Sequence, residues 1–305
     1  MAVVSSVNYG VIASENKEKT GYIAVTDSGV GGLAVLKKLK NDFNDLNFLY
    51  VSDCACVPYG NKSKKQIIAL CKKNIKTAFL NGAVAIVVAC NTMSRVGKEA
   101  FLKCGAPCFF VEPNYEVLSA ADKNYRNCAV FCTEATAADK MLKSLKNNLK
   151  CSVFPQKNLA KQIESRLSER CVKNDKPLKE KSLKNDGYEK NVGNEKYVIN
   201  YGDDYDIDFS DCDADFCAKN FKTVFLSCTH YIHIGHIFEE KFKNAKIYDG
   251  TEKLKSEISE FLKNAGKSSF AKSLRGGKIK FAGSGKTKMK RVFLWLCNKK
   301  TTENR

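Results

Sequence analysis

Two cysteines in this chain stand at equivalent positions, and both could take part in proton transfer. Cys90 follows a β-branched apolar run in "VVACNT", residues 87–92, and Cys228 follows a similar run in "FLSCTH", residues 225–230. Each apolar run predicts a buried strand, and a helix is expected to begin just after each cysteine. The positive end of a helix dipole lowers the pKa of a nearby thiol, so we expect both cysteines to have a raised thiolate fraction.

Small polar residues follow both thiols and could bind a carboxylate. Asn91 and Thr92 come after the first thiol, and Thr229 and His230 come after the second. Such side chains, together with the free N–H groups at the start of a helix, can hold an anion. The plainer interpretation is two buried packing residues, since cysteine is among the most buried residue types. The matching strand ends and polar followers favour a functional pair.

A pair of thiols from two halves of a chain suits the inversion of a carbon centre. One thiolate removes a proton from one face of the carbon, and the opposite thiol donates a proton to the other face. No cofactor is required if the site stabilises a carbanion-like transition state and excludes water. For this chemistry we expect neither a cofactor nor a metal.

The elements that position these thiols alternate regularly along the chain. Alternating strands and amphipathic helices predict an α/β fold with parallel sheets, in which ligands bind at the carboxyl ends of the strands. The predicted strands cover residues 22–26, 47–53, 83–90, 107–113, 127–134, 222–228 and 245–250. The predicted helices cover residues 33–43, 63–82, 92–105, 114–124, 135–148, 232–244 and 251–266.

The regular pattern is interrupted between about residues 170 and 220. This stretch is highly charged, and residues 203–215 include seven aspartates. An EF-hand calcium loop would need oxygens at fixed spacing, a central glycine and a closing glutamate, and this run lacks them. We interpret residues 170–220 as a surface insertion or a partly disordered loop.

Two glycine-rich stretches look like phosphate-binding motifs. "GSGKT", residues 283–287, has Lys280 where a phosphate loop needs a glycine, so it does not predict a nucleotide site. Residues 29–34 fit G-x-G-x-x-A after a strand, and Asp53 ends the next strand as a ribose-binding acid would. From these residues alone, a dinucleotide-binding enzyme is a serious alternative.

Composition describes a globular protein of one large or two smaller domains, with 305 residues of which 44% are hydrophobic. No apolar run reaches the roughly 18 residues of a membrane helix, and the start shows no signal-peptide pattern. The fourteen cysteines then indicate reduced thiols and a cytoplasmic location. His230, His233 and His236 are the one fair metal candidate, but zinc sites need a coherent N/S ligand set and we expect none here.

The net charge of +18 permits contact with nucleic acid or acidic membranes. Lysine supplies most of this charge, and the basic stretch from Lys263 to Arg305 has few arginines. A nucleic-acid-binding surface would interleave arginines and aromatic residues in a basic stripe. We therefore interpret the charge as a solvated surface, and do not favour nucleic acid as a partner.

Four motifs carry a resemblance to a known family. "IAVTDSGVGGLAVLKKL", "YVSDCACVPYGNKS", "VVACNT" and "LSCTHY" occur in this order and resemble the successive motifs of the glutamate racemases. These enzymes belong to the cofactor-independent aspartate/glutamate racemase superfamily. The resemblance covers about residues 22–160 and 222–295. It implies that the glycine-rich loop, led by Asp27 and Ser28, lines an amino-acid site and binds no nucleotide.

The resemblance also implies the architecture and the biological role. It implies two similar doubly wound α/β domains with mainly parallel sheets and an active site in the cleft between them. We expect a tail at 1–20, a first domain at 21–113 completed by 250–300, and a second domain at 114–249. The implied substrate is glutamate, and the product D-glutamate is used for bacterial peptidoglycan. An aspartate racemase with the same thiols is the alternative, a nucleic-acid-binding protein on this scaffold is a weaker one, and a homodimer is left open.

The resemblance assigns roles to particular residues. Cys90 and Cys228 would be the acid/base thiols, with Asp27 assisting the first and His230 the second. The expected substrate-binding residues are Asp27, Ser28, Tyr59, Gly60, Asn91, Thr92, Thr229 and His230. Several positions depart from the family pattern: Cys54 and Cys56 are interpreted as packing or loop thiols, and Ser227 replaces a glycine. The family's acid near the second thiol cannot be placed in "CSVFPQKNLAKQIE".

Overall fold

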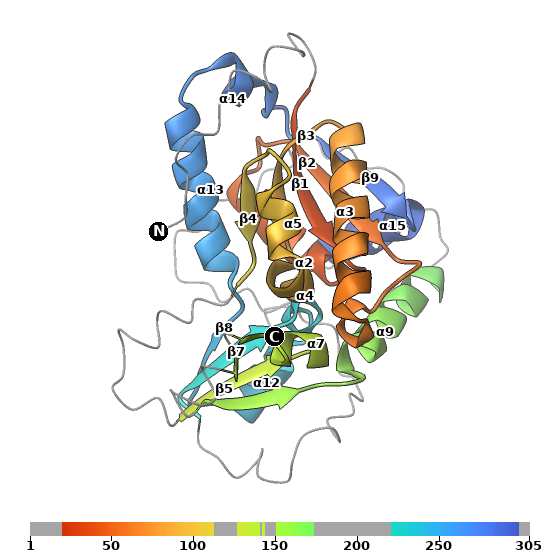
Figure 1. Cartoon of the computed structure of the whole chain (residues 1–305), viewed down its shortest axis with the longest axis vertical. Coiled ribbons are helices and arrows are strands. Elements are labelled where there is room, and N and C mark those ends of the chain that lie inside the picture. Colours follow the sequence, from red (N-terminus) through yellow and green to blue (C-terminus); the bar gives the residue numbers. More distant parts are fainter. Residues whose placement is uncertain (1–19, 113–126, 141, 144–150, 174–220, 299–305) are drawn as a thin grey trace.

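The computed structural model shows two α/β domains, one below the other in Figure 1. It describes residues 20–112, 127–140, 142–143, 151–173 and 221–298. Within these ranges, all strand pairings of both sheets are parallel. The predicted α/β class and parallel sheets are therefore confirmed.

The first sheet has five strands in the order β4-β3-β1-β2-β9. Side chains alternate across it, as the period of two in a strand requires. Ile23 and Val25 point into one hydrophobic core, while Ala24 between them points into the other. The strands are β1 (Tyr22–Asp27), β2 (Phe48–Asp53), β3 (Ala83–Val88), β4 (Cys108–Phe110) and β9 (Ile279–Ser284).

Helices cover both faces of the first sheet. Leu36 and Phe293 lie in the core on one face, and Ile67 and Phe101 lie in the core on the other. The helices on the first of these faces are α2 (Gly32–Asp42), α13 (Thr251–Ala265), α14 (Ser269–Ser273) and α15 (Lys286–Asn298). The other face carries η1 (Tyr59–Asn61), α3 (Lys64–Leu80), α4 (Asn91–Val96) and α5 (Lys98–Leu102).

The second sheet has four strands in the order β6-β5-β7-β8. Its aromatic core is centred on Phe131, whose ring stacks on Phe154 at 5.0 Å and meets Phe238 edge-on at 4.9 Å. The strands are β5 (Cys128–Cys132), β6 (Ser152–Pro155), β7 (Thr223–Ser227) and β8 (Lys246–Tyr248). The helices of this part are α7 (Glu134–Ala137), α9 (Leu159–Lys173), α11 (Thr229–Ile232) and α12 (Gly235–Lys241).

Some predicted elements differ from the observed ones. The single helix predicted over 92–105 is wrong, because the chain forms α4 and α5 with a break at Gly97. A Cβ at Gly97 would lie 2.3 Å from the Cys71 sulfur, so α3 packs directly against this break. Helix α9 extends to Lys173, so the insertion begins later than 170. Helix α7 ends at Ala137, so the helix predicted over 135–148 does not continue unbroken. Outside the described residues lie 1–19 of the predicted tail, the helix predicted at 114–124, residues 141 and 144–148 of that predicted at 135–148, and residues 174–220 of the insertion.

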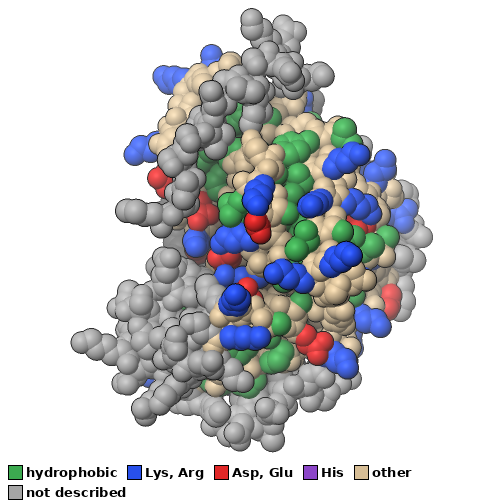
Figure 2. Space-filling model, viewed as in Figure 1, with side chains coloured by type: hydrophobic (Ala, Val, Ile, Leu, Met, Phe, Trp, Pro, Cys, Tyr) green, Lys and Arg blue, Asp and Glu red, His purple; other side chains and the backbone are tan. Residues whose placement is uncertain are grey.

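One hydrophobic core joins the two domains. The cluster that contains Val30 and Leu36 of the first domain also contains Phe131 and Tyr231 of the second. The outer face in Figure 2 carries lysine and arginine side chains dispersed among hydrophobic and acidic ones. In the part of the chain that the structure describes, no helix is long and apolar enough to cross a membrane.

Candidate active site

Cys90 lies between the interior strand β3 and helix α4. The strand ends at Val88, and Cys90 occupies the N-cap position of α4. The side chain is buried, and its sulfur donates a long hydrogen bond of 3.9 Å to Ser28 Oγ. Ser28 follows β1, the neighbour of β3, so two adjacent parallel strands bring these residues together at their carboxyl ends.

Cys228 occupies the matching position in the second domain. It directly follows β7 and is the N-cap residue of α11. The buried sulfur lies 3.7 Å from His230 Nδ1, within the same turn of helix. The sequence prediction that each thiol stands between a strand and a helix is therefore confirmed.

Glu164 is an acidic residue beside His230 to which the sequence analysis assigned no role. It lies on α9, and its Oε2 accepts hydrogen bonds from His230 Nε2 at 2.9 Å and from the Val30 backbone N–H at 2.8 Å. Its other oxygen contacts Lys288 Nζ of α15 at 3.3 Å. A continuous polar chain thus runs from Lys288 through Glu164 and His230 to the Cys228 sulfur.

Asp27 ends β1 and links the two domains. One carboxylate oxygen accepts the Gly29 N–H at 3.1 Å. The other accepts the Thr229 hydroxyl at 3.1 Å, although Thr229 belongs to the second domain. Asp27 is fully buried, so both contacts are made out of water, where they are electrostatically strong.

The glycine-rich loop after β1 is packed against the second domain. A Cβ at Gly29 would lie 2.3 Å from Glu164 Oε2. A Cβ at Gly31 would lie 2.6 Å from Thr229 Oγ1 and 2.7 Å from His230 Nδ1. The glycines let these polar groups approach the loop backbone, and this space is filled by protein. The dinucleotide alternative is therefore wrong for this loop.

His230 is held in its charged form. Burial opposes the charge, but the hydrogen bonds and negative charges of Cys228 and Glu164 outweigh it and raise the pKa of His230 well above its usual range. Burial would likewise raise the pKa of Glu164, yet the hydrogen bond and charge of His230 hold that pKa below its usual range. The two residues form a buried imidazolium–carboxylate pair beside the Cys228 sulfur.

The surroundings of Cys90 and Asp27 favour the neutral forms of both side chains, in contrast to the charged pair of His230 and Glu164. Burial, followed by the charge of Asp27, raises the pKa of the Cys90 thiol. Burial also raises the pKa of Asp27 above its usual range. The expected lowering of the pKa by a helix dipole is wrong for Cys90, because α4 has only six residues and desolvation of the thiolate outweighs so short a dipole.

Sequence comparison relates this chain to enzymes of known type, although no family model matches it. A protein named glutamate racemase 3 from Caldanaerobacter subterraneus subsp. tengcongensis is 30% identical over 248 residues, which cover 79% of this chain and 78% of the relative. The chain belongs to the glutamate racemase family. Glutamate racemase 2 of the same organism is 29% identical and covers 92% of this chain and 95% of its own length.

Solved glutamate racemases share the fold. A glutamate racemase isoform from Bacillus anthracis has a TM-score of 0.63 at 20% identity, covering 92% of this chain and 95% of its own. A glutamate racemase from Francisella tularensis, crystallised with D-glutamate, has a TM-score of 0.60 at 20% identity, covering 91% of this chain and 93% of its own. The two-domain α/β architecture is therefore that of the glutamate racemase family.

Several of the residues expected to bind substrate lie where the two domains of this racemase-family chain meet. Asn91 Nδ2 is buried and has no hydrogen-bond partner among the described residues. Thr92 Oγ1 lies 3.0 Å from Thr133 Oγ1 of the second domain. Gly60 abuts the same Thr133, since a Cβ there would lie 2.7 Å from it. The Tyr59 hydroxyl, by contrast, is engaged by Asp53 and Asn74, each at 3.3 Å.

The remaining candidates have structural partners. His233 Nε2 lies 3.1 Å from the backbone oxygens of Val30 and Gly31, and burial lowers the pKa of this imidazole to about 3. Within the described ranges, no group of three or more histidine, cysteine or acidic side chains is placed to hold a metal. Asp53 accepts hydrogen bonds from Lys73 at 3.1 Å and from Ser284 of the "GSGKT" stretch at 2.8 Å.

Proposed function

We propose that this protein is a glutamate racemase that interconverts L- and D-glutamate with Cys90 and Cys228 as its two acid/base groups. The observation that carries the proposal is the placement of the two thiols. Each stands at the carboxyl end of an interior strand, one in each domain, with its own charged partner, Asp27 for Cys90 and His230 for Cys228. A negative charge on the Cys228 sulfur contributes to the raised pKa of Cys90, as expected of two groups that lie near each other.

The two thiols begin a turnover in different protonation states. We propose that Cys228, which lies 3.7 Å from His230 Nδ1, starts as the base, whereas burial and the charge of Asp27 raise the pKa of Cys90 and favour its neutral thiol. In one direction, Cys228 removes the α-proton and Cys90 donates its proton to the opposite face. The reverse direction starts from the exchanged states, with Asp27 supporting proton transfer at Cys90.

The substrate is bound by polar groups around the thiols. We assign the carboxylates and ammonium group of glutamate to Asp27, Ser28, Tyr59, Gly60, Asn91, Thr92, Thr229 and His230. The unpartnered, buried Nδ2 of Asn91 supports this assignment, because a buried amide without a partner is costly unless a ligand accepts its hydrogen bond. Tyr59 would contribute through its backbone, since its hydroxyl is already engaged.

Burial of the site supports carbanion chemistry. Cys90 and Cys228 are each only 6% exposed, so a bound substrate would be shielded from water. In such surroundings fixed hydrogen-bond donors stabilise developing negative charge strongly. We propose that the two domains separate to admit glutamate and close again over it.

The wider biological role follows from the reaction. We propose that the enzyme works in the cytoplasm without cofactor or metal, and supplies D-glutamate for peptidoglycan. We also propose the domain division into 21–113 with 250–300, and 114–249. A homodimer is a further proposal, for which sedimentation of the purified chain is the direct measurement.

Incubation in deuterated water tests the reaction. Purified protein with L-glutamate, excess chelator and no added cofactor should lose optical rotation and gain one α-deuteron in the product. L-Aspartate in a parallel reaction should remain unchanged. Racemisation of aspartate in place of glutamate would support the alternative superfamily member. Activity that requires added zinc or pyridoxal phosphate would overturn the two-thiol mechanism.

A further inference from the structure

A second pair of cysteines lies outside the proposed active site. Cys104 follows α5 and Cys108 begins β4, and the short turn "CGAPC" connects them. Their sulfurs are 3.6 Å apart, and both side chains are partly exposed. No step of the proposed racemisation uses either thiol.

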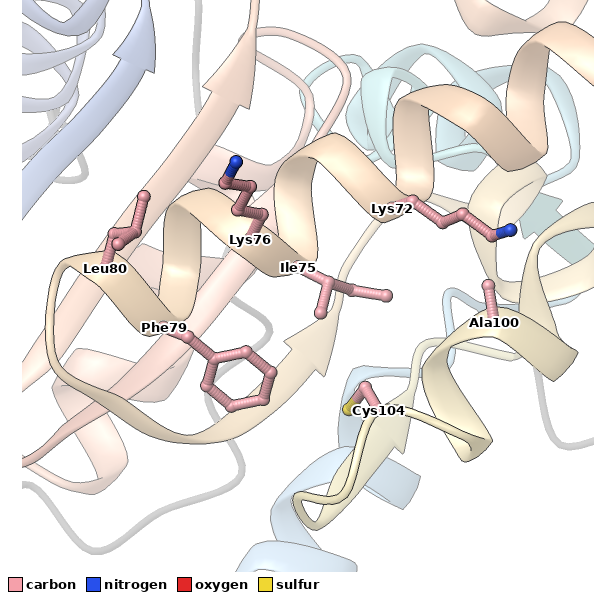
Figure 3. Close-up of a pocket in the computed structure, with 7 residues that line it drawn as sticks. All are labelled: Lys72, Ile75, Lys76, Phe79, Leu80, Ala100 and Cys104. Carbon is pink, nitrogen blue, oxygen red and sulfur yellow. The ribbon is translucent and has the colours of Figure 1, made fainter. Parts of the chain in front are cut away.

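Cys104 of this pair lines a surface groove between α3 and α5, shown in Figure 3. Ile75 and Phe79 of α3 form one wall, and Ala100 and Cys104 form the other. The Cys104 sulfur points into this groove. A small oxidant in solvent can therefore reach Cys104 without unfolding of the domain.

We propose that Cys104 and Cys108 are a peroxide-reactive dithiol that closes to an intramolecular disulfide. The Cys104 thiolate attacks one oxygen of a hydroperoxide, forms a sulfenic acid and releases hydroxide or alkoxide, which takes up a proton. The Cys108 thiol then attacks the Cys104 sulfur, forms the S–S bond and releases water. The hydroperoxide is the two-electron oxidant, so the step is balanced, and a thiol reductant restores the dithiol.

The local geometry provides what each step requires. The hydrogen bond from Cys108 lowers the pKa of Cys104 to about 7, so a large share of this thiol is the reactive thiolate near neutrality. Disulfide closure needs the sulfurs to approach from 3.6 Å to about 2.05 Å. Gly105 between them has a φ of +84° and open space around it, so the turn can adjust.

The pair Cys128 and Cys151 provides an internal contrast. Their sulfurs are closer, at 2.8 Å, but the residues are only 1% and 3% exposed. Proximity without access should leave them reduced under brief oxidation. One pair is accessible to solvent, and the other has closer sulfurs but is buried. The two pairs therefore test the effects of access and of proximity separately.

Peptide mapping after brief peroxide treatment tests the proposal. Trypsin cleavage after Lys103 and Lys123 yields one peptide that contains Cys104 and Cys108 and no other cysteine. After peroxide, quenching and alkylation, this peptide should be two hydrogens lighter and unalkylated, and a thiol reductant should reverse the change. The Cys128 and Cys151 peptides should stay reduced. Failure of the 104–108 disulfide to form, or its formation only after the buried pair, would overturn the proposal.

Single variants assign the two roles. Cys108→Ser should stop at the Cys104 sulfenic acid, which a dimedone probe traps, and Cys104→Ser should form neither product. In the wild-type chain near neutral pH, iodoacetamide should label Cys104 at least about tenfold faster than Cys54, whose pKa burial raises to about 11. Equal labelling of the two would contradict the assigned order of attack. Racemase activity of both variants serves as the check that they fold.

Discussion

At the residue scale, the catalytic proposal depends on two sulfurs that cannot replace each other. Each would serve one face of the α-carbon, so Cys90→Ser and Cys228→Ser should each lower racemisation by roughly 10²–10⁴-fold, because a hydroxyl is a far weaker acid and base partner. Each variant retains one thiol, so it should still start elimination from a β-substituted glutamate analogue. The two variants should prefer opposite enantiomers of that analogue.

Cys54 supplies the matched control for these substitutions. Its side chain is partly buried, its sulfur lies 3.6 Å from Ser52 Oγ, and it is neither of the two proposed acid/base thiols. Cys54→Ser should keep most activity in the same optical-rotation assay. A near-parental rate for Cys228→Ser would show that the likeness of "VVACNT" and "FLSCTH" is only a repeated fold element.

Glu164 should set the upper pH limit of the reaction. Glu164→Gln removes the carboxylate that stabilises the His230 imidazolium, so the pKa of His230 should fall. The basic limb of kcat/KM should therefore move to lower pH, with roughly a tenfold or larger loss near pH 8, typical of losing a charge-assisted hydrogen bond. If the basic limb of the Glu164→Gln variant, measured from about pH 6 to 10, is unchanged, then Glu164 does not influence the proton transfer.

Lys288 should act on the other limb of the same profile. Its ammonium helps to hold the pKa of Glu164 low, so Lys288→Met should raise that pKa and move the acidic limb to higher pH. The lysine is partly exposed, so the loss of activity should be modest, about two- to fivefold. Lys288→Arg, which keeps the charge, should restore the parental profile if the effect is electrostatic.

At the element scale, the loop between β1 and α2 fixes how closely the domains approach. Gly31 has ordinary helical dihedrals, so alanine costs nothing in the backbone there, but its Cβ would meet Thr229 and His230. Gly31→Ala should therefore lower kcat/KM and destabilise the fold by about 1–3 kcal/mol, as overpacking does. Kinetics and denaturant unfolding measure the two effects.

Gly235→Ala is the corresponding control. Gly235 begins α12, and a Cβ there would have nothing within 4 Å. Alanine at this position should leave activity unchanged and stability equal or slightly higher, because it restricts the unfolded chain. An equal loss of activity in both variants would mean that contact with His230 is not the cause of the Gly31 effect.

The sequence predicted most elements that carry the thiols, because those strands are long apolar runs next to turn residues. It missed β6 and α9, since β6 is four residues long and ends in Pro155, and charged residues obscure the period of α9. It also assigned no element after residue 266, where the structure has α14, β9 and α15. Glu164 was therefore not assigned. Its partners His230 and Lys288 are 66 and 124 residues away, and only the packing of α9 against α11 and α15 reveals them.

At the scale of the whole molecule, the shared core couples the two domains energetically. Val30 and Phe131 belong to one continuous cluster, so neither domain can unfold without exposing apolar surface of the other. We expect one cooperative transition. The single tryptophan, Trp295 on α15, reports on the first domain, and far-ultraviolet circular dichroism reports on both. The two denaturation curves should coincide, whereas separate midpoints would show independent domains.

Under the proposed two-thiol mechanism, the burial of both thiols would also give the enzyme a short-lived record of its last reaction. A turnover that starts with the thiolate at Cys228 would end with the thiolate at Cys90, so the released enzyme would be poised for the opposite enantiomer. With each thiol only 6% exposed, water resets this state slowly. At high substrate concentration, the rate would then be governed by this resetting of the free protein and no longer by breaking of the carbon–hydrogen bond.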